Sequence, residues 1–143
     1  MAKSGRYASN RIKIEDLSSN KTVEIHDCGT MFMYTETAAF TTIQLPTVAK
    51  AGAGWWCRIV VETMIGGDID CNVAQSTADT NNIVVLRAID GSGAAVTQIG
   101  ADGVTIIGDT AVAGDFIELW TDGTKWYGQV FCSAAGGIVA YNA

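Results

Sequence analysis

Three adjacent residues, His26, Asp27 and Cys28, combine a base, a carboxylate and a thiol, which are the groups of a catalytic nucleophile site. Such a site requires the base to lie within hydrogen-bond reach of both the nucleophile and an orienting partner. The surrounding sequence, TVEIHDCG, predicts a β-strand over Thr22–His26. Neighbouring side chains of a strand point to opposite faces, so His26 and Asp27 are not expected to form a relay. We interpret His26, the only histidine, as a polar residue at a strand end.

Aspartate residues cluster near glycines, for example Asp115 after Gly114 and Asp122 before Gly123. Oxygen-rich loops of this type hold calcium in some proteins, but no series of alternating acidic residues closed by a glutamate occurs here. Aspartate also favours tight turns, because its side chain accepts hydrogen bonds from the nearby backbone. Turn formation therefore explains these carboxylates, with bound calcium as the alternative. The set comprises Asp68, Asp70, Asp79, Asp109, Asp115 and Asp122.

The four cysteines, Cys28, Cys57, Cys71 and Cys132, are scattered along the chain without a C-x-x-C pair. Zinc sites usually contain such a pair, so we interpret the cysteines as small buried apolar residues. No glycine-rich loop leads into a helix with a lysine, as phosphate binding would require. We therefore expect no cofactor, no metal site and no catalytic residue, and hence a protein that is not an enzyme.

The composition of the 143 residues is apolar, with 48% hydrophobic and 17% charged residues. An ordinary globular domain has about 25% charged residues. A surface with so little charge is expected either where other subunits cover part of it or in a domain merely rich in alanine and glycine. No apolar run approaches the roughly 20 residues that cross a bilayer, so no membrane contact is expected. The first residues contain no hydrophobic stretch that could serve as a signal peptide, which indicates synthesis in a cytoplasm.

Charge divides the chain into a basic N-terminal arm, residues 1–21, and an acidic domain, residues 22–143. The arm has five basic and two acidic residues, a net charge of +3, and the domain has four basic and thirteen acidic residues, a net charge of −9. The acidic domain argues against nucleic acid as the principal partner. The arm is predicted to dock on an acidic protein surface, the alternative being a terminus that nothing ties down.

The elements that must position these residues are short β-strands, because apolar runs alternate with turn residues every 8 to 12 residues or so. We predict a single all-β domain, an antiparallel β-sandwich with an extended N-terminal arm. Thr47–Gly54 is interpreted as a loop with at most one helical turn. The predicted strands are Arg11–Ile14, Thr22–His26, Thr30–Tyr34, Phe40–Leu45, Trp55–Met64, Ile69–Val73, Ile83–Ala88, Val96–Ile99, Val104–Ile107, Phe116–Thr121, Lys125–Cys132 and Ile138–Tyr141.

The segment GDFIELWTDGTKWYGQV, residues 114–130, predicts a hairpin that turns at Asp122-Gly123 and carries four aromatic side chains. Alternation places one set of side chains in the core and the other set on the outer face. The outer set is expected to meet another subunit, because aromatic residues are enriched at interfaces; a monomer core that holds every aromatic residue is the alternative. The inner set is Ile117, Leu119, Trp126 and Val130, and the outer set is Phe116, Trp120 and Tyr127.

Three segments in order, CGTMFMYTETAAFTTIQLP, AGAGWWCRIVV and GVTIIGDTAVAGDFIELWTDGTKWYGQV, resemble a group of virion proteins of tailed bacteriophages. The resemblance covers Gly29 to about Val130. It departs from the usual pattern at Trp55-Trp56, where one aromatic or aliphatic residue is common, and this leaves open whether Trp56 lies inside the fold or at a subunit contact. The positions that carry the resemblance are Gly29, Leu45-Pro46, Gly52 or Gly54, Gly114-Asp115, Asp122-Gly123 and Trp126-Tyr127.

The resemblance implies a β-sandwich or jelly-roll-like module that assembles as a homotrimer. Such modules occur in capsid decoration (cement) proteins and in tail-fibre or tailspike proteins. A short chain with a basic arm favours decoration of the capsid exterior, with the major capsid protein as partner; a tail module that adheres to host-surface glycans is the alternative. The expected trimer interface is Trp56, Phe116, Trp120 and Tyr127, and the expected capsid-docking residues of the arm are Arg6, Arg11 and Lys13.

Overall fold

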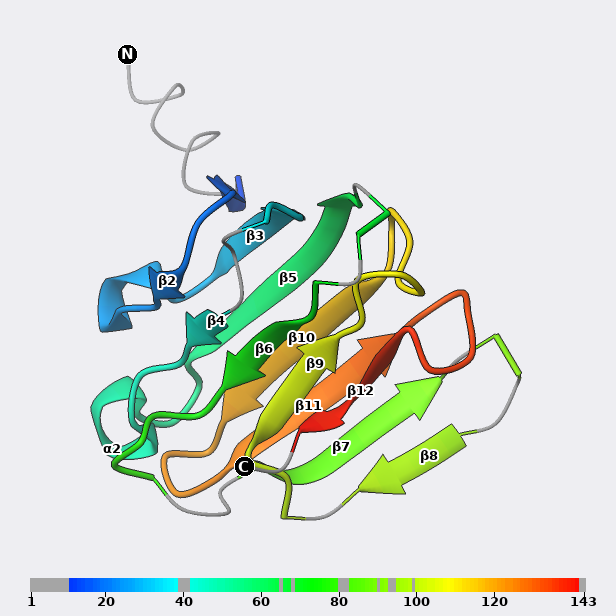
Figure 1. Ribbon diagram of the computed structural model, residues 1–143. Coiled ribbons are helices and arrows are strands. Elements are labelled where there is room, and N and C mark those ends of the chain that lie inside the picture. Colours follow the sequence, from blue (N-terminus) through cyan, green and yellow to red (C-terminus); the bar gives the residue numbers. More distant parts are fainter. Residues whose placement is uncertain are drawn as a thin grey trace.

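Two β-sheets packed face to face make up the fold in the computed structural model (Figure 1). The structure describes residues 11–38, 42–64, 66–67, 69–79, 83–89, 91–92, 95–98 and 100–141. Helical structure in these ranges is limited to a 3-10 turn, η1 (Ile25–Asp27), and a helix of 4 residues, α2 (Val48–Ala51). The prediction of an all-β sandwich is confirmed at this level, as is the single helical turn after Pro46.

The larger sheet has seven strands in the order β1-β3-β5-β10-β11-β7-β8. Its outer edge strand, β1, lies within the segment that the charge pattern assigns to the N-terminal arm, and it pairs in parallel with β3. The strands are β1 (Lys13–Leu17), β3 (Thr30–Thr35), β5 (Trp56–Thr63), β7 (Ile83–Ile89), β8 (Ala95–Gln98), β10 (Phe116–Thr121) and β11 (Trp126–Phe131).

The smaller sheet has five strands in the order β12-β9-β6-β4-β2. Residues 39–41, where one of its predicted strands was expected to begin, lie outside the described ranges. The strands are β2 (Lys21–Thr22), β4 (Thr42–Gln44), β6 (Cys71–Ala74), β9 (Gly103–Ile106) and β12 (Ile138–Tyr141).

The first six strands alternate between the two sheets, and this overturns the prediction of antiparallel sheets. Strands β1, β3 and β5 lie in the larger sheet and pair in parallel, and β2, β4 and β6 do the same in the smaller sheet. Each of these strands is followed by a strand of the opposite sheet. When the chain comes back to the first sheet, its next strand runs in the same direction as the strand before it in that sheet. The antiparallel pairs that the turns predict come later, as in the β10–β11 hairpin, and both sheets are mixed.

The core lies between the sheets and takes alternate side chains from both. Ile59, Ile117 and Leu119 of the larger sheet and Val73 and Val104 of the smaller sheet are fully buried. Trp126 and Val130 of β11 belong to the same cluster. The predicted inner set of the hairpin is therefore confirmed in full.

A 3-10 turn stands where the sequence predicted the end of the Thr22–His26 strand, because two side chains cap the turn. The Glu24 side chain and the Asp27 side chain each bond the other residue's backbone, which forms a capping box around Ile25 and His26. Capping of this kind satisfies backbone N–H groups that a strand would give to a neighbour. His26 and Asp27 consequently lie on the same side, with His26 Nε2 and Asp27 Oδ1 separated by 3.9 Å.

Candidate functional site

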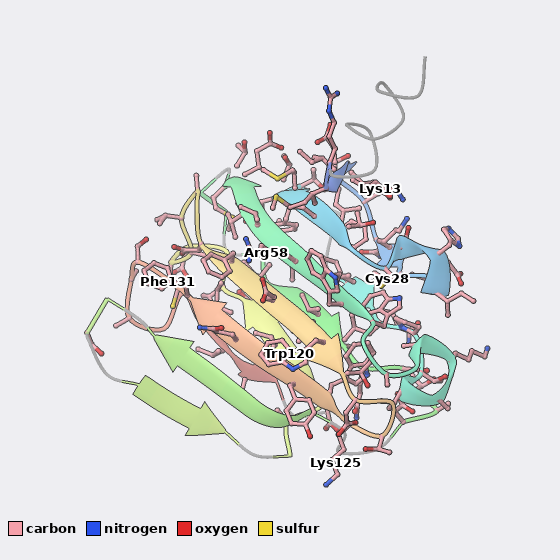
Figure 2. The ribbon with its side chains drawn as sticks, turned by 180° about the vertical axis from the view of Figure 1, so that it is seen from behind. Lys13, Cys28, Arg58, Trp120, Lys125 and Phe131 are labelled. Atoms are coloured by element: carbon pink, nitrogen blue, oxygen red, sulfur yellow. The ribbon has the colours of Figure 1, made fainter. Side chains whose placement is uncertain are left out.

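The outer face of the larger sheet carries a group of aromatic and apolar side chains that no element of the described chain covers. Figure 2 shows Trp120, Arg58 and Phe131 on this side of the sheet, away from the smaller sheet. Trp120 is 38% exposed and Phe131 is 46% exposed. We name this surface the aromatic face. It comprises Trp56, Arg58, Val60, Phe116, Glu118, Trp120, Tyr127, Gln129 and Phe131.

Strand register arranges the aromatic face in three rows across β5, β10 and β11. In the first row the rings of Trp120 and Tyr127 stack with centroids 6.2 Å apart and planes 14° apart. In the third row Phe116 and Phe131 stack at 5.8 Å and 15°. Cross-strand aromatic pairs of this kind stabilise a sheet and also present flat ring surfaces outward. The rows are Trp56–Trp120–Tyr127, Arg58–Glu118–Gln129 and Val60–Phe116–Phe131.

The middle row places one ion pair between two apolar rows. The Nε of Arg58 donates to Glu118 Oε2 at 2.8 Å, and its Nη2 donates to the same oxygen. The guanidinium carbon of Arg58 also lies 5.1 Å from the centre of the Phe116 ring, within the range of a cation–π contact. The charges of this face are thus paired with each other within one chain.

The outer face of the smaller sheet has the opposite character. Its middle row consists of Thr42, Asn72 and Thr105, followed by Val139 at the β12 edge. The hydroxyl of Thr105 donates to Asn72 Oδ1 at 2.7 Å. Polar rows are typical of a sheet face turned to water. The aromatic face therefore differs from an ordinary solvent-facing surface of the same molecule.

The tryptophan doublet separates into one core residue and one surface residue. Trp55 is buried, donates from its indole nitrogen to Ile25 O at 3.0 Å, and packs edge-on against Trp126. Trp56 lies half-buried on the aromatic face, over Gly29, where an added Cβ would meet its ring at 3.8 Å. Gly29 has a φ of 78°, a conformation that favours glycine.

All four residues expected at the trimer interface, Trp56, Phe116, Trp120 and Tyr127, lie together on the aromatic face. The alternative, a monomer core that takes in every aromatic residue, is wrong for them. Sequence reasoning missed Phe131 and the Arg58–Glu118 pair. The period of two along β11 could have found Phe131, which follows Tyr127 and Gln129 on the same side. The ion pair required the register between β5 and β10, which no local pattern supplies.

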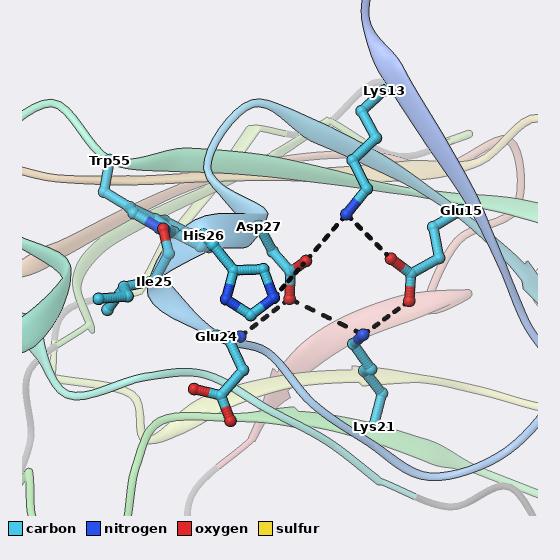
Figure 3. Close-up of polar contacts among 8 residues, drawn as sticks. All are labelled: Lys13, Glu15, Lys21, Glu24, Ile25, His26, Asp27 and Trp55. Carbon is cyan, nitrogen blue, oxygen red and sulfur yellow. Dashed lines mark hydrogen bonds and ion pairs between the residues drawn. The ribbon is translucent and has the colours of Figure 1, made fainter.

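The expected docking residues of the arm do not form a site in the described chain. Arg6 lies outside the described residues, and Arg11 is exposed. Lys13 is held in a charge cluster with Asp27, Glu15 and Lys21, which we name the Asp27 cluster (Figure 3). Its Nζ donates to Asp27 Oδ1 at 3.1 Å, so Lys13 links β1 to η1.

Asp27 is the centre of this cluster, with a side chain that is only 1% exposed. Burial favours the neutral form of its carboxyl, but the backbone N–H of Glu24 and the charges of Lys13 and Lys21 outweigh burial. Together they hold the pKa of Asp27 below its ordinary value of 3.8. The hydrogen bond from Lys21 lowers the pKa of Glu15, and the hydrogen bond to Asp27 raises the pKa of Lys13. The Asp27 carboxylate of η1 thus contacts Lys13 of β1 and Lys21 of β2, and it joins the three elements.

Substituting Asp27→Asn is expected to lower the free energy of unfolding at pH 7 by about 1.5–3 kcal/mol, the usual range for hydrogen bonds to a charged group. Because the pKa of Asp27 is depressed in the folded state, its contribution is complete above its ordinary pKa of 3.8 and is lost as pH falls through the lower folded value. Urea unfolding over a series of pH values from 7 downward measures this, and the difference in stability between the two proteins should narrow as the pH falls below 3.8.

The matched control for this substitution is Asp16→Asn. Asp16 is exposed on β1 and has no ion pair within the described ranges. The Asp16→Asn substitution should change the midpoint of urea unfolding little at any pH. An Asp27→Asn protein as stable as the wild type at pH 7 would contradict the role of the cluster.

Three of the four cysteines are buried, as predicted, but Cys28 is exposed, which corrects the prediction for that residue. Cys28 is the residue that ends η1, and it lies at the surface. Burial raises the pKa of Cys57. Burial also raises the pKa of Cys71, to about 12, although a hydrogen bond with the Tyr34 hydroxyl partly offsets this effect. The thiolate is the reactive form, so Cys57 and Cys71 are protected both by burial and by their raised pKa values, and Cys132 is protected by burial.

A thiol-specific disulfide reagent is expected to label one cysteine of the native protein rapidly at pH 8 and the other three only on unfolding. Cys28→Ser should abolish the rapid phase, and Cys132→Ser should leave it unchanged. Absorbance of the released thiolate measures both. Rapid labelling of a second thiol in the native state would contradict the buried positions.

Of the aspartates near glycines, Asp115 and Asp122 bond the backbone of their own turns, as turn formation predicts. Asp70 and Asp79 instead bond backbone that lies more than 30 residues away in the sequence, and Asp109 bonds the Thr110 hydroxyl. Asp70 accepts from Gly108 N, Asp79 from Val48 N, and Asp115 from Val112 N and Ser133 N. Asp122 accepts from Thr124 N and Lys125 N, and these bonds lower its pKa. Asp68 lies outside the described residues. Within the described ranges, no three acidic, histidine or cysteine side chains gather as metal ligands.

Comparisons of the chain with protein-family models, with curated proteins and with solved structures found no match. Over the residues that can be described, no helix has the length and apolar character that a membrane span requires.

Proposed function

We propose that this chain is a structural protein of a tailed-phage head, which binds the outer shell as a homotrimer and stabilises it without catalysis. The observation that carries the proposal is the aromatic face, where stacked rings on adjacent strands lie uncovered on one side of the sandwich. The resemblance of the sequence to tailed-phage virion proteins supports the rest. The jelly-roll-like winding implied by that resemblance belongs to the same proposal.

The composition of this face supports self-association. Large contiguous apolar patches on soluble proteins mark interaction sites, and the core of an interface is enriched in aromatic residues and arginine. Trp56, Phe116, Trp120 and Tyr127 would be buried between copies, together with Phe131. The smaller sheet, whose outer face is polar, would then face water.

Binding to the shell would stabilise it by mass action. A ligand a hundredfold above its Kd contributes about 2.7 kcal/mol to the state that it binds. A trimer with three basic arms gains further, because the second and third contacts with the major capsid protein become intramolecular. A three-fold symmetric molecule is suited to three-fold positions of a shell. Arg6, Arg11 and Lys13 remain the predicted docking residues, although Lys13 would exchange its contact with Asp27 for one with the shell.

A second candidate function, adhesion of a tail to host-surface glycans, is favoured by one observation. Trp120 and Tyr127 present nearly parallel rings next to the Asp122 carboxylate, which accepts from the Tyr127 hydroxyl at 2.9 Å. Aromatic faces with a few well-placed polar groups are typical of small-molecule sites. In this alternative the rings would stay accessible in the assembly.

Sedimentation equilibrium at micromolar concentration tests the proposal first, with an expected mass of three times the 15.1 kDa of one chain. Copy number in purified virions then separates the two functions. A decoration protein should match the shell subunits in order of magnitude, and a tail protein should be far rarer. A chain that stays monomeric and is missing from the outer shell would overturn the proposal.

A further inference from the structure

The Arg58–Glu118 pair leaves hydrogen-bonding capacity unused at the centre of the aromatic face. Both hydrogen bonds from Arg58 converge on Oε2 of Glu118. Among the residues described, no hydrogen bond reaches Oε1 of Glu118 or leaves Nη1 of Arg58. The two side chains are 36% and 28% exposed, so water solvates these groups in the isolated chain.

Covering the aromatic face would remove that water. Burying a charged pair is favourable only when its remaining donors and acceptors are also satisfied. Within the described chain the flanking rows make no hydrogen bond to these atoms, and neither does Gln129, the third residue of the middle row. Whatever covers the face must bring an acceptor for Arg58 and a donor for Glu118 to the same place.

A second copy of the chain carries both groups in the required arrangement. We propose that copies meet at their aromatic faces so that Arg58 of each copy donates to Oε1 of Glu118 in the next copy. The contacts then close a ring of alternating charges around the symmetry axis. A cyclic assembly permits this, because each interface joins one patch to a different patch of the neighbour. The inference rests on the proposed trimer and names the contact that orients its subunits.

Arg58 and Glu118 can pair within one chain or between two chains. Charge-reversal variants distinguish the contact between chains from the contact within one chain. Arg58→Glu gives each copy two acidic groups in the row, and Glu118→Arg gives each copy two basic groups. Like charges across an interface cost several kcal/mol, so each variant alone should associate at least about tenfold more weakly than the wild type. The double variant Arg58→Glu/Glu118→Arg should recover association, since every contact is opposite in charge again.

Mixing the two single variants is the decisive experiment. In a ring of three, mixed assemblies hold two matched contacts and one mismatched contact, so the mixture should associate more tightly than either variant alone. Native mass spectrometry with one variant labelled with ¹⁵N identifies the mixed assemblies. Lys125→Glu is the control, because Lys125 is exposed near the hairpin turn and away from the middle row (Figure 2), and it should not alter association.

The outcomes distinguish this contact from the trimer itself. Thermal unfolding of each variant is compared with that of the wild type at a concentration where both are monomeric, so that the stability lost with the half-buried intrachain pair is measured apart from association. A wild type that remains monomeric overturns the proposed function and this inference together. A wild type that associates, with a mixture no better than its components, overturns the inference alone.

Discussion

Trp126→Ala is expected to lower the free energy of unfolding by about 3–5 kcal/mol, the range for removing a large aromatic side chain from a core. Trp126 is fully buried and packs edge-on against Trp55, with ring centroids 5.4 Å apart and planes at 84°. It is the largest of the fully buried side chains. Domains of this size have about 5–15 kcal/mol of total stability, so the variant would lose a large part of it.

Urea unfolding followed by circular dichroism measures the loss, and Trp126→Phe is the matched control. The indole N–H of Trp126 is buried and finds no acceptor in the described chain. Phenylalanine removes that polar group and keeps much of the apolar volume, so its cost should be clearly smaller. An alanine variant within about 1 kcal/mol of the wild type would contradict the position of Trp126 in the core.

Trp120→Ala, in contrast to Trp126→Ala, is expected to weaken association strongly and to change the stability of the monomer little. Its side chain lies on the aromatic face, in the same hairpin as Trp126, and buries less surface in the isolated chain. Tryptophans at the centre of interfaces commonly contribute 2 kcal/mol or more, so the dissociation constant of the trimer should rise by about 30-fold or more. The stability of the monomer should change by no more than about 1 kcal/mol.

Sedimentation velocity over a concentration series measures this effect, and Val139→Ala is the control. Val139 is 38% exposed, as Trp120 is, but it lies on the outer face of the smaller sheet. Its truncation should leave the oligomeric state unchanged. Equal effects of the two substitutions would show that the aromatic face has no special part in association.

Local periodicity predicts the C-terminal hairpin well. The strand Phe116–Thr121 has the bounds that the sequence indicates, and its inward and outward residues alternate as expected. The turn at Asp122 forms because its carboxylate accepts backbone N–H groups two and three residues on. Each of these features depends on residues that are close in sequence, and so a single sequence contains the necessary information.

The parallel pairs could not be predicted, because they join segments with no short connection. Thr30 pairs with Cys57, and Lys21 pairs with Ile43, across connections that pass through the other sheet. Turn residues mark only where a strand ends and do not say which sheet the chain enters next. The Asp27 cluster depends on this topology, since Lys13 reaches Asp27 only when β1 lies beside β3.

The candidate site was predictable in its parts and not in its arrangement. Alternation identifies Trp120 and Tyr127 as outward residues, and their chemistry indicates an interface. Whether outward residues of different strands gather in rows depends on register, which is set by long-range pairing. The opposed characters of the two outer faces became visible only with both sheets in place.

Because the first six strands alternate between layers, the N-terminal half is wound as a flattened spiral. Its first turn has a neighbour on one side only, and of β1 only Leu17 is buried. In stacked architectures the terminal repeat is the easiest to detach, since it loses one set of contacts where an inner repeat loses two. A partner that pulls the first turn away would break the β1–β3 pairing and the Asp27 cluster, and it would leave the paired rings on β10 and β11, in the middle of the sheet, undisturbed.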